Sequence, residues 1–274
     1  MNDGVSFDEV TAVRSLGDGS YVADLHPDWS VGERPHGGYL LALLARAATH
    51  AVDGDDLAPL STSAHYLRAP RSGPVLIRTK VLKTGRTVSV LRAVLEQRGQ
   101  TCVDTTITVG RLPQDDAAWA DLPDMPVNPP STAVDASSAQ AGKFFELTRA
   151  CDLRLDPSGA GFLTGSTSEP LRLRMWVRPR GCQPDLLFSL VAGDITVPVT
   201  FNLGRIGWSP TVQLTALLRA QPANGWLRLA VESKAVHGQW FDEDTLVIDS
   251  TGRLICQARQ LALSPLESAS ERGS

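Results

Sequence analysis

The chain of 274 residues lacks the features that mark a membrane protein or a secreted protein. No window approaches the roughly 18 uninterrupted apolar residues that a membrane-spanning helix needs. The first nine residues have neither the basic nor the apolar segment of a secretory signal, and they already carry Asp3, Asp8 and Glu9. We therefore expect a cytoplasmic protein without a membrane partner.

Clustered cysteines, clustered histidines and an excess of basic residues are also missing. The four cysteines lie far apart without a Cys-x-x-Cys pair, so neither a disulfide framework nor a zinc site is indicated. The formal net charge is −4 and both signs are mixed along the chain, which argues against a nucleic-acid partner. We expect no metal and no other cofactor.

Several common enzyme motifs are absent. The Gly-x-Ser steps that begin at Gly4 and Gly207 lack the second glycine of a nucleophile elbow, which argues against an α/β-hydrolase. No Gly-x-Gly-x-x-Gly follows a strand-like segment and no P-loop occurs, so the nucleotide cofactors that these motifs bind are not indicated.

The first half of the sequence predicts one buried helix followed by an antiparallel meander. Residues 37–52 are apolar nearly all round and contain no proline, which is typical of a buried helix. The Gly37-Gly38 pair at its start allows a close approach of other groups to the backbone. Four strand-like runs follow, separated by residues typical of hairpin turns: 60–67, 75–82, 88–97 and 101–109.

A linker and a second, similar half follow. Pro, Asp, Ser and Ala dominate from residue 112 to about residue 140, which predicts an N-terminal unit of residues 1–112, a linker of 113–140 and a C-terminal unit of 141–274. In the second unit we expect a short apolar helix over 184–192. The strands expected there are 143–155, 170–177, 211–219, 226–235, 240–248 and 254–263.

Six segments resemble the acyl-CoA thioesterase II type family of double hotdog proteins, particularly its actinobacterial members. The first half carries PHGGYLLALLARAA (35–48), HYLRAPRSGPV (65–75) and KTGRTVSV (83–90). The second half carries SPTVQLTALLRAQP (209–222), GWLRLAVESKAVHGQWF (225–241) and DSTGRLICQARQLAL (249–263). The resemblance implies an α+β double hotdog, with two tandem units that each wrap a curled antiparallel sheet around a long central helix. It also implies acyl-CoA or another acyl thioester as the ligand.

The resemblance implies three residues that hold a water molecule for hydrolysis. Similar family members use an Asp in the first C-terminal meander strand, a Thr or Ser one strand later, and a Gln near the end of the last strand. Gln260 stands at the last position, whereas Gln213 replaces the Asp and Lys234 replaces the hydroxyl residue. A glutamine can orient a water molecule but cannot accept its proton near pH 7.

Other residues are candidates for the general base and for the oxyanion donors that hydrolysis needs. Asp194 resembles an Asp that the family places at the end of its second-unit helix, and it is the leading candidate for a general base; a loop Asp bonded to backbone groups is the alternative. His36 precedes Gly37 and Gly38 at a predicted helix N-terminus, where the N–H groups of Gly38 and Tyr39 could stabilise a developing oxyanion.

Two basic residues are candidates for substrate binding. Arg86, in the tight turn at 85–86, could contact the 3'-phosphate of CoA, with simple solvation as the alternative. Lys234 is the other.

Three functions stay open at this point. The first is hydrolysis of an acyl thioester. The second is a non-hydrolytic hotdog enzyme or binder that acts on an acyl or polyketide-like ligand by elimination or cyclisation, because Gln213 replaces the carboxylate. The third is a purely structural or interaction role. Exposed strands also make a homo-oligomer plausible.

Overall fold

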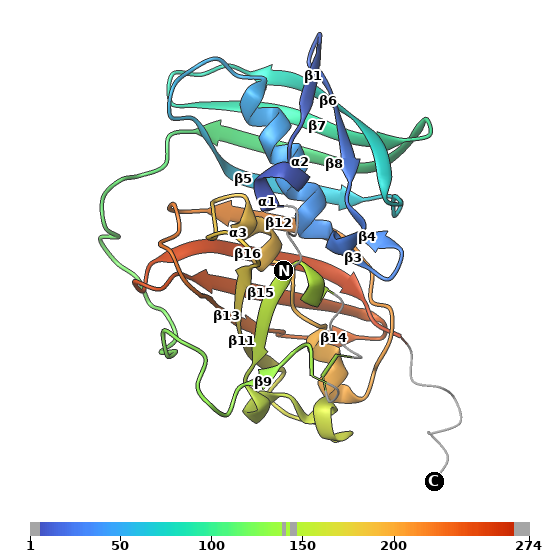
Figure 1. The fold of residues 1–274 in the computed structure, drawn as a ribbon, viewed down its shortest axis with the longest axis vertical. Helices are drawn as coiled ribbons and strands as arrows, with labels where there is room; N and C mark the ends of the chain where they lie inside the picture. The colour runs from blue at the N-terminus through green and yellow to red at the C-terminus, as the bar shows by residue number, and fades with distance from the viewer. Residues whose placement is uncertain (1–5, 139–140, 143–146, 266–274) are drawn as a thin grey trace.

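The computed structural model describes residues 6–138, 141–142 and 147–265. Within these residues, 14 strands form one antiparallel sheet in the order β1-β2-β6-β7-β8-β5-β12-β16-β15-β13-β11-β10-β9, with β14 paired to β15 (Figure 1). The strands of the first half are β1 Arg14–Gly17, β2 Ser20–Leu25, β5 Ala58–Tyr66, β6 Gly73–Lys83, β7 Val88–Gln97 and β8 Gln100–Gly110; the separate pair β3 Ser30–Val31 and β4 Arg34–Pro35 precedes the first long helix. Those of the second half are β9 Val134–Asp135, β10 Cys151–Leu155, β11 Arg172–Pro179, β12 Thr211–Leu218, β13 Leu227–Glu232, β14 Val236–His237, β15 Trp240–Ile248 and β16 Leu254–Leu263.

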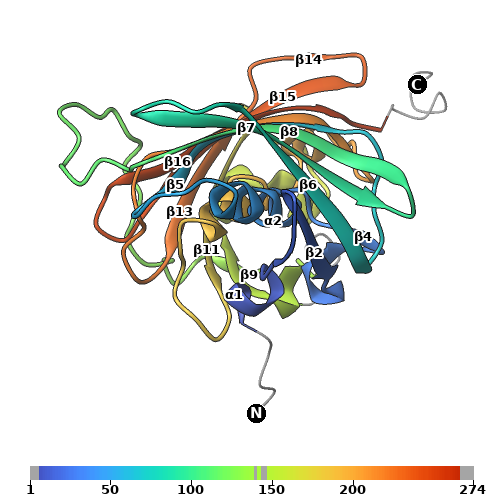
Figure 2. The same ribbon diagram turned by 90° about the horizontal axis from the view of Figure 1, so that it is seen from above.

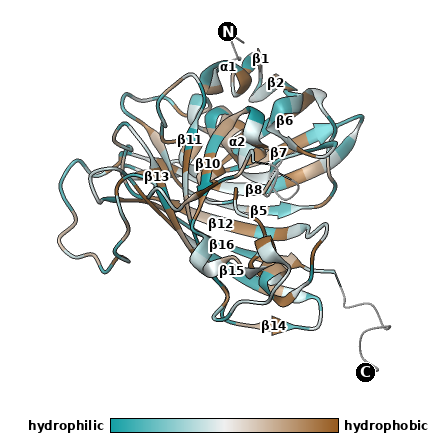
Figure 3. Ribbon diagram, turned by 60° about the horizontal axis from the view of Figure 1, so that its bottom comes forward, coloured by the Kyte–Doolittle hydropathy of each residue, from teal (hydrophilic) through white to brown (hydrophobic). Residues whose placement is uncertain are grey.

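The two halves of the chain share this sheet. Strand β5 pairs with β12 in antiparallel register, with Ala64 opposite Leu214, so the meanders on either side are continuous. Hydrophobic residues predominate in β12 (Figure 3), as expected of a strand with neighbours on both edges. The sheet curls around α2 (Gly37–His50), which lies on its concave side (Figure 2).

Helix α2 is stabilised by the burial of its apolar side chains. Ten of its 14 residues are buried, and their Leu and Ala side chains pack on both the sheet and α3 (Phe188–Ala192). Gly38 sits where α2 meets α3: a Cβ on Gly38 would lie 2.5 Å from the carbonyl oxygen of Leu190 and 2.7 Å from Cα of Val191. This close approach fixes the N-terminus of α2 beside the loop that follows α3.

The expectation of a long central helix in each unit is wrong for the second half of the chain. Among the described residues, α2 is the one long helix, and its counterpart α3 has five residues. The physical reason lies in the sequence, because Pro184 and Gly193 leave space for little more than two turns. Part of the predicted strand 143–155 lies outside the described residues, and the observed strand β10 begins at Cys151.

A segment without helix or strand, residues 111–133, separates β8 from β9. It overlaps the predicted linker, but the division into two units with a linker at 113–140 stays a prediction. A short helix, α1 (Phe7–Val10), is capped by Ser6 and Glu9 and packs its Phe7 ring on Trp29 and Phe188.

Candidate active site

A cavity of about 690 Å³ lies where the two halves meet. The first half contributes the N-terminus of α2 and the end of β5, and the second half contributes the loop after α3 and residues of β12, β15 and β16. Much of the wall is apolar, and a few polar side chains face the same space. These polar residues include His36, Tyr66, Asp194, Thr211 and Gln260.

Asp194 is held against the N-terminus of α2. Its Oδ2 accepts the N–H of Gly38 at 2.7 Å, and Nε2 of His36 lies 3.0 Å from its carbonyl oxygen and 3.5 Å from Oδ2. The side chain is only 6% exposed. Burial raises the pKa of Asp194, while His36 and the Gly38 N–H act in the opposite direction. The result is a buried carboxyl group at the cavity whose proton affinity is higher than usual, as a general base requires.

Gly37 leaves a gap between two polar groups. A Cβ on Gly37 would lie 2.7 Å from Oδ2 of Asp194 and 3.1 Å from the hydroxyl oxygen of Tyr66. A side chain at this position would therefore collide with both groups. The glycine keeps the space beside the carboxylate and the phenol open.

A chain of hydrogen bonds lines another part of the cavity. The hydroxyl of Thr211 donates to Oε1 of Gln260 at 2.6 Å, and Nε2 of Gln260 donates to Oε2 of Glu243 at 2.5 Å. Oε1 of Glu243 accepts the N–H of Val199 at 2.9 Å. Burial raises the pKa of Glu243 to about 8, and Asp194 adds to the rise. Glu243 thus holds the amide of Gln260, which in turn holds Thr211.

An irregularity in β12 brings Thr211 to this position. The register between β12 and β16 shifts between Thr211 and Gln213, which is the signature of a β-bulge. Strict alternation would place the two side chains on the same face of the sheet. Instead Thr211 bonds to Gln260, whereas the amide of Gln213 donates to Thr215 at 2.7 Å and lies 3.4 Å from Ser63.

The structure brings together part of the set predicted from the sequence. His36, Gly37, Asp194 and Gln260 line the cavity, whereas Gln213 does not. The expected oxyanion donor at Gly38 needs correction, because its N–H is already bonded to Asp194. Tyr39, the other residue expected to supply an N–H, is not among the described residues that line the cavity; its side chain is buried in the core, where its hydroxyl donates to the carbonyl of Val10 at 2.8 Å.

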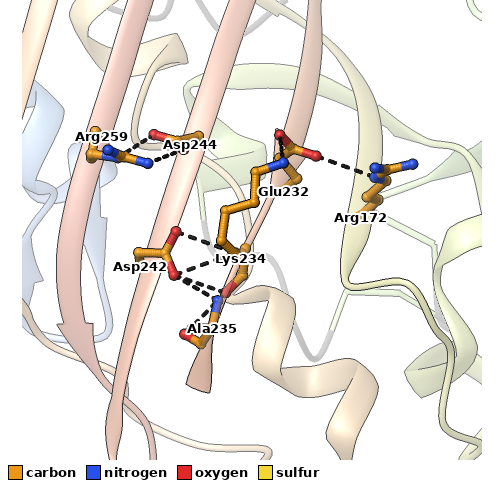
Figure 4. Close-up of polar contacts among 8 residues, drawn as sticks. Arg172, Glu232, Lys234, Ala235, Asp242, Asp244 and Arg259 are labelled. Carbon is orange, nitrogen blue, oxygen red and sulfur yellow. Dashed lines mark hydrogen bonds and ion pairs between the residues drawn. The ribbon is translucent and has the colours of Figure 1, made fainter. Parts of the chain in front are cut away.

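Neither predicted basic residue lines the cavity. Lys234 follows β13, and its ammonium group pairs with Glu232 at 2.5 Å while its backbone N–H faces the carboxylate of Asp242 (Figure 4). Asp242 and its neighbour Asp244 project from the face of β15 opposite the buried Glu243. Arg86 is exposed in the turn between β6 and β7.

The rim of the cavity carries an aromatic and cationic surface. The guanidinium of Arg34 lies 4.2 Å from the ring centroid of Trp208, which is 48% exposed, and Arg68 lines the same rim. Within the described ranges, neither arginine forms an ion pair with a carboxylate. Both arginines are exposed.

In the described part of the chain, no three His, Cys, Asp or Glu side chains are grouped so that they could hold a metal ion. None of the helices formed by the described residues has the length and apolar character to cross a membrane.

Comparisons with known proteins match both halves of the chain to acyl-CoA thioesterase domains. Residues 25–110 match the family described as the acyl-CoA thioesterase N-terminal domain, and residues 120–264 match the acyl-CoA thioesterase C-terminal domain. An uncharacterized protein of Mycobacterium tuberculosis is 35% identical over 268 residues, which covers 90% of this chain and 91% of that protein.

Solved structures give the same result. A crystal structure from Thermobifida fusca, provisionally described as a thioesterase II, superposes with a TM-score of 0.84 at 32% identity and covers 94% of this chain and 97% of that one. The acyl-CoA thioesterase II TesB2 of Mycobacterium marinum has a TM-score of 0.72 at 16% identity, covers 96% of this chain and 99% of that one, and supports the fold alone.

The fold and the comparisons define an α+β protein of the hotdog class with a large antiparallel sheet. The chain belongs to the acyl-CoA thioesterase II family of double hotdog proteins, as its sequence motifs indicate, and the relatives named here include actinobacterial proteins.

Proposed function

We propose that this protein hydrolyses an acyl-CoA thioester to a free acid and a thiol. The observation that carries the proposal is that Asp194 and the bonded pair Thr211 and Gln260 face one cavity, although they come from three separate parts of the chain. A general base and two polar groups that orient a water molecule are what thioester hydrolysis requires.

The proposed reaction begins with a water molecule held between Asp194 and the Thr211 hydroxyl. Because the hydrogen of that hydroxyl is donated to Gln260, its oxygen is free to accept a hydrogen bond from the water. Asp194 removes one proton as the water oxygen attacks the thioester carbonyl carbon. The carbon–sulfur bond then breaks, and the departing sulfur takes the proton from Asp194.

The lining of the cavity supports an acyl thioester as the substrate. Apolar residues such as Leu40, Val197 and Phe241 offer a surface for the acyl chain. At the rim, Arg34 and Trp208 could receive the phosphate and adenine groups of CoA, since guanidinium groups bind phosphate and aromatic rings stack on bases. In this proposal the rim takes the part that the sequence suggested for Arg86 and Lys234.

The non-hydrolytic alternative is weakened by the position of Gln213. Its motive was the neutral side chain at an expected carboxylate position, but Gln213 lies outside the cavity lining. Elimination or cyclisation on an acyl or polyketide-like ligand remains the alternative that a negative hydrolysis assay would favour. The cytoplasmic location and the homo-oligomeric state stay predictions.

Release of free thiol from a panel of acyl-CoA esters tests the proposal. The panel covers short, medium, long and aromatic acyl groups, and the matching N-acetylcysteamine thioesters report how much the CoA nucleotide contributes. We expect turnover of at least one acyl-CoA, with a higher KM for its truncated analogue. No thiol release from any acyl group would overturn the proposal.

A further inference from the structure

The hydroxyl of Tyr66 is a buried polar group at the cavity, and it has no hydrogen-bond partner among the residues that the structure describes. Of the buried side-chain polar atoms that make no hydrogen bond among the described residues, two belong to residues of the cavity lining: Nδ1 of His36 and the hydroxyl of Tyr66. An unsatisfied buried hydroxyl costs free energy, so its retention calls for a functional explanation.

The position of Tyr66 relates this hydroxyl to the proposed general base. Tyr66 is the last residue of β5, and its ring faces Gly37 and Asp194. The gap left by Gly37 is bordered on one side by Oδ2 of Asp194 and on the other by the Tyr66 hydroxyl. Burial, with a further contribution from Asp194, raises the pKa of Tyr66 well above its usual value. The phenol therefore stays protonated and can donate a hydrogen bond to a substrate oxygen.

Hydrolysis needs such a donor, because negative charge develops on the thioester oxygen when water attacks. Of the two predicted donors, the Gly38 N–H is bonded to Asp194, and Tyr39 is not among the described residues that line the cavity. The Thr211 hydroxyl donates to Gln260. The hydrogen of Tyr66, in contrast, has no acceptor within the described residues.

We infer that Tyr66 is a catalytic residue whose hydroxyl donates a hydrogen bond to the carbonyl oxygen of the thioester. The inference rests on the proposed function. When the water oxygen bonds to the carbonyl carbon, the π electrons of the C=O bond move to the oxygen, and the Tyr66 O–H stabilises that oxyanion without giving up its proton. When the oxyanion collapses, the carbonyl re-forms and the carbon–sulfur bond breaks.

The test compares Tyr66→Phe with Tyr39→Phe in the full chain. Each substitution removes one hydroxyl and keeps the ring. Tyr66→Phe should lower kcat by about 10²- to 10³-fold, the usual effect of removing one oxyanion donor, with KM changed less than about threefold and Tm unchanged or higher. Tyr39→Phe removes a hydroxyl that donates to Val10 and accepts from His26, so it should lower Tm and leave kcat within about threefold.

The outcomes separate this inference from the proposed function. If the wild-type protein hydrolyses an acyl-CoA and Tyr66→Phe retains its kcat, the role of Tyr66 is refuted and the function stands. If Tyr66→Phe lowers Tm as much as Tyr39→Phe does and kcat stays close to wild type, the hydroxyl is a structural group. If the wild-type protein releases no thiol, the proposed function and the role of Tyr66 both fail.

Discussion

Replacing Glu243 with glutamine tests whether this carboxyl group is buried as the structure places it. Glu243 is 1% exposed, and its two oxygens accept hydrogen bonds from Gln260 and from the N–H of Val199. Burial raises its pKa from the usual value of 4.5 to about 8. Glutamine has nearly the same shape and carries no charge at any pH. It loses one of the two acceptor oxygens, which lowers its stability by an amount that does not vary with pH, so the change with pH in its difference from wild type reports the cost of ionisation.

The sign of the effect follows from proton binding. Because the folded-state pKa lies above the unfolded one, the folded protein binds more protons between about pH 4.5 and 8, and its stability falls as pH rises through that window. A shift of this size corresponds to an upper limit of about 5 kcal/mol. Water entry and side-chain relaxation around the ionised group reduce the cost, so we expect about 2–4 kcal/mol.

Urea unfolding at intervals from pH 5 to pH 8.5 measures this contribution. The free energy of unfolding of Glu243→Gln should rise relative to wild type by that amount across the range, since other titrating groups are common to both proteins. Glu232→Gln is the matched control: the hydrogen bond from Lys234 lowers the pKa of Glu232, so the stabilisation by its charge is complete above about pH 4.5 and the difference between this variant and wild type should stay constant from pH 5 to pH 8.5. A constant difference between Glu243→Gln and wild type from pH 5 to 8.5 would refute the burial argument.

Two other substitutions test the site and the packing beneath it. Gln213→Asp should change kcat for thiol release less than about threefold, because residue 213 lies outside the cavity lining; a large gain would instead show that Gln213 limits hydrolysis. Gly38→Ala should lower the free energy of unfolding by about 3 kcal/mol, because its Cβ would meet the backbone of Leu190 and Val191. A urea titration measures this loss, and an unchanged midpoint would show that α2 and α3 can separate.

Local sequence patterns predicted much of the fold. The apolar segment 37–52 corresponds to α2, and the four runs of the first meander correspond to β5 to β8, because burial and turn residues leave periodic signals in the sequence. The family resemblance implied a long helix in the second half, and this prediction was wrong. The shorter helix predicted from local residues at 184–192 does contain α3.

The site was predictable only in part. Asp194, His36 and Gln260 were identified from motifs, and all three line one cavity. Thr211 was missed because the family resemblance points to Gln213, and the β-bulge that brings Thr211 to Gln260 leaves no signal in the sequence.

Glu243 lies in no motif, and Tyr66 lies in the family segment 65–75 without a role assigned to it. Glu243 looks like one of several acidic residues in a strand, and only its inward position and its bond to Gln260 distinguish it from Asp242 and Asp244. Tyr66 becomes a candidate only when its hydroxyl is found buried and unpaired beside Gly37. These contacts join segments that are far apart in the sequence, so a local sequence pattern does not reveal them.

The most direct test of the central claim is the rate of thiol release by Asp194→Asn, measured beside wild type and the control Asp116→Asn, which changes an exposed residue of the segment 111–133. The asparagine can still accept the N–H of Gly38, so the fold should be retained while the general base is lost. The account predicts that kcat falls by at least about 100-fold in Asp194→Asn and stays at the wild-type value in Asp116→Asn. A folded Asp194→Asn protein with wild-type kcat would contradict it.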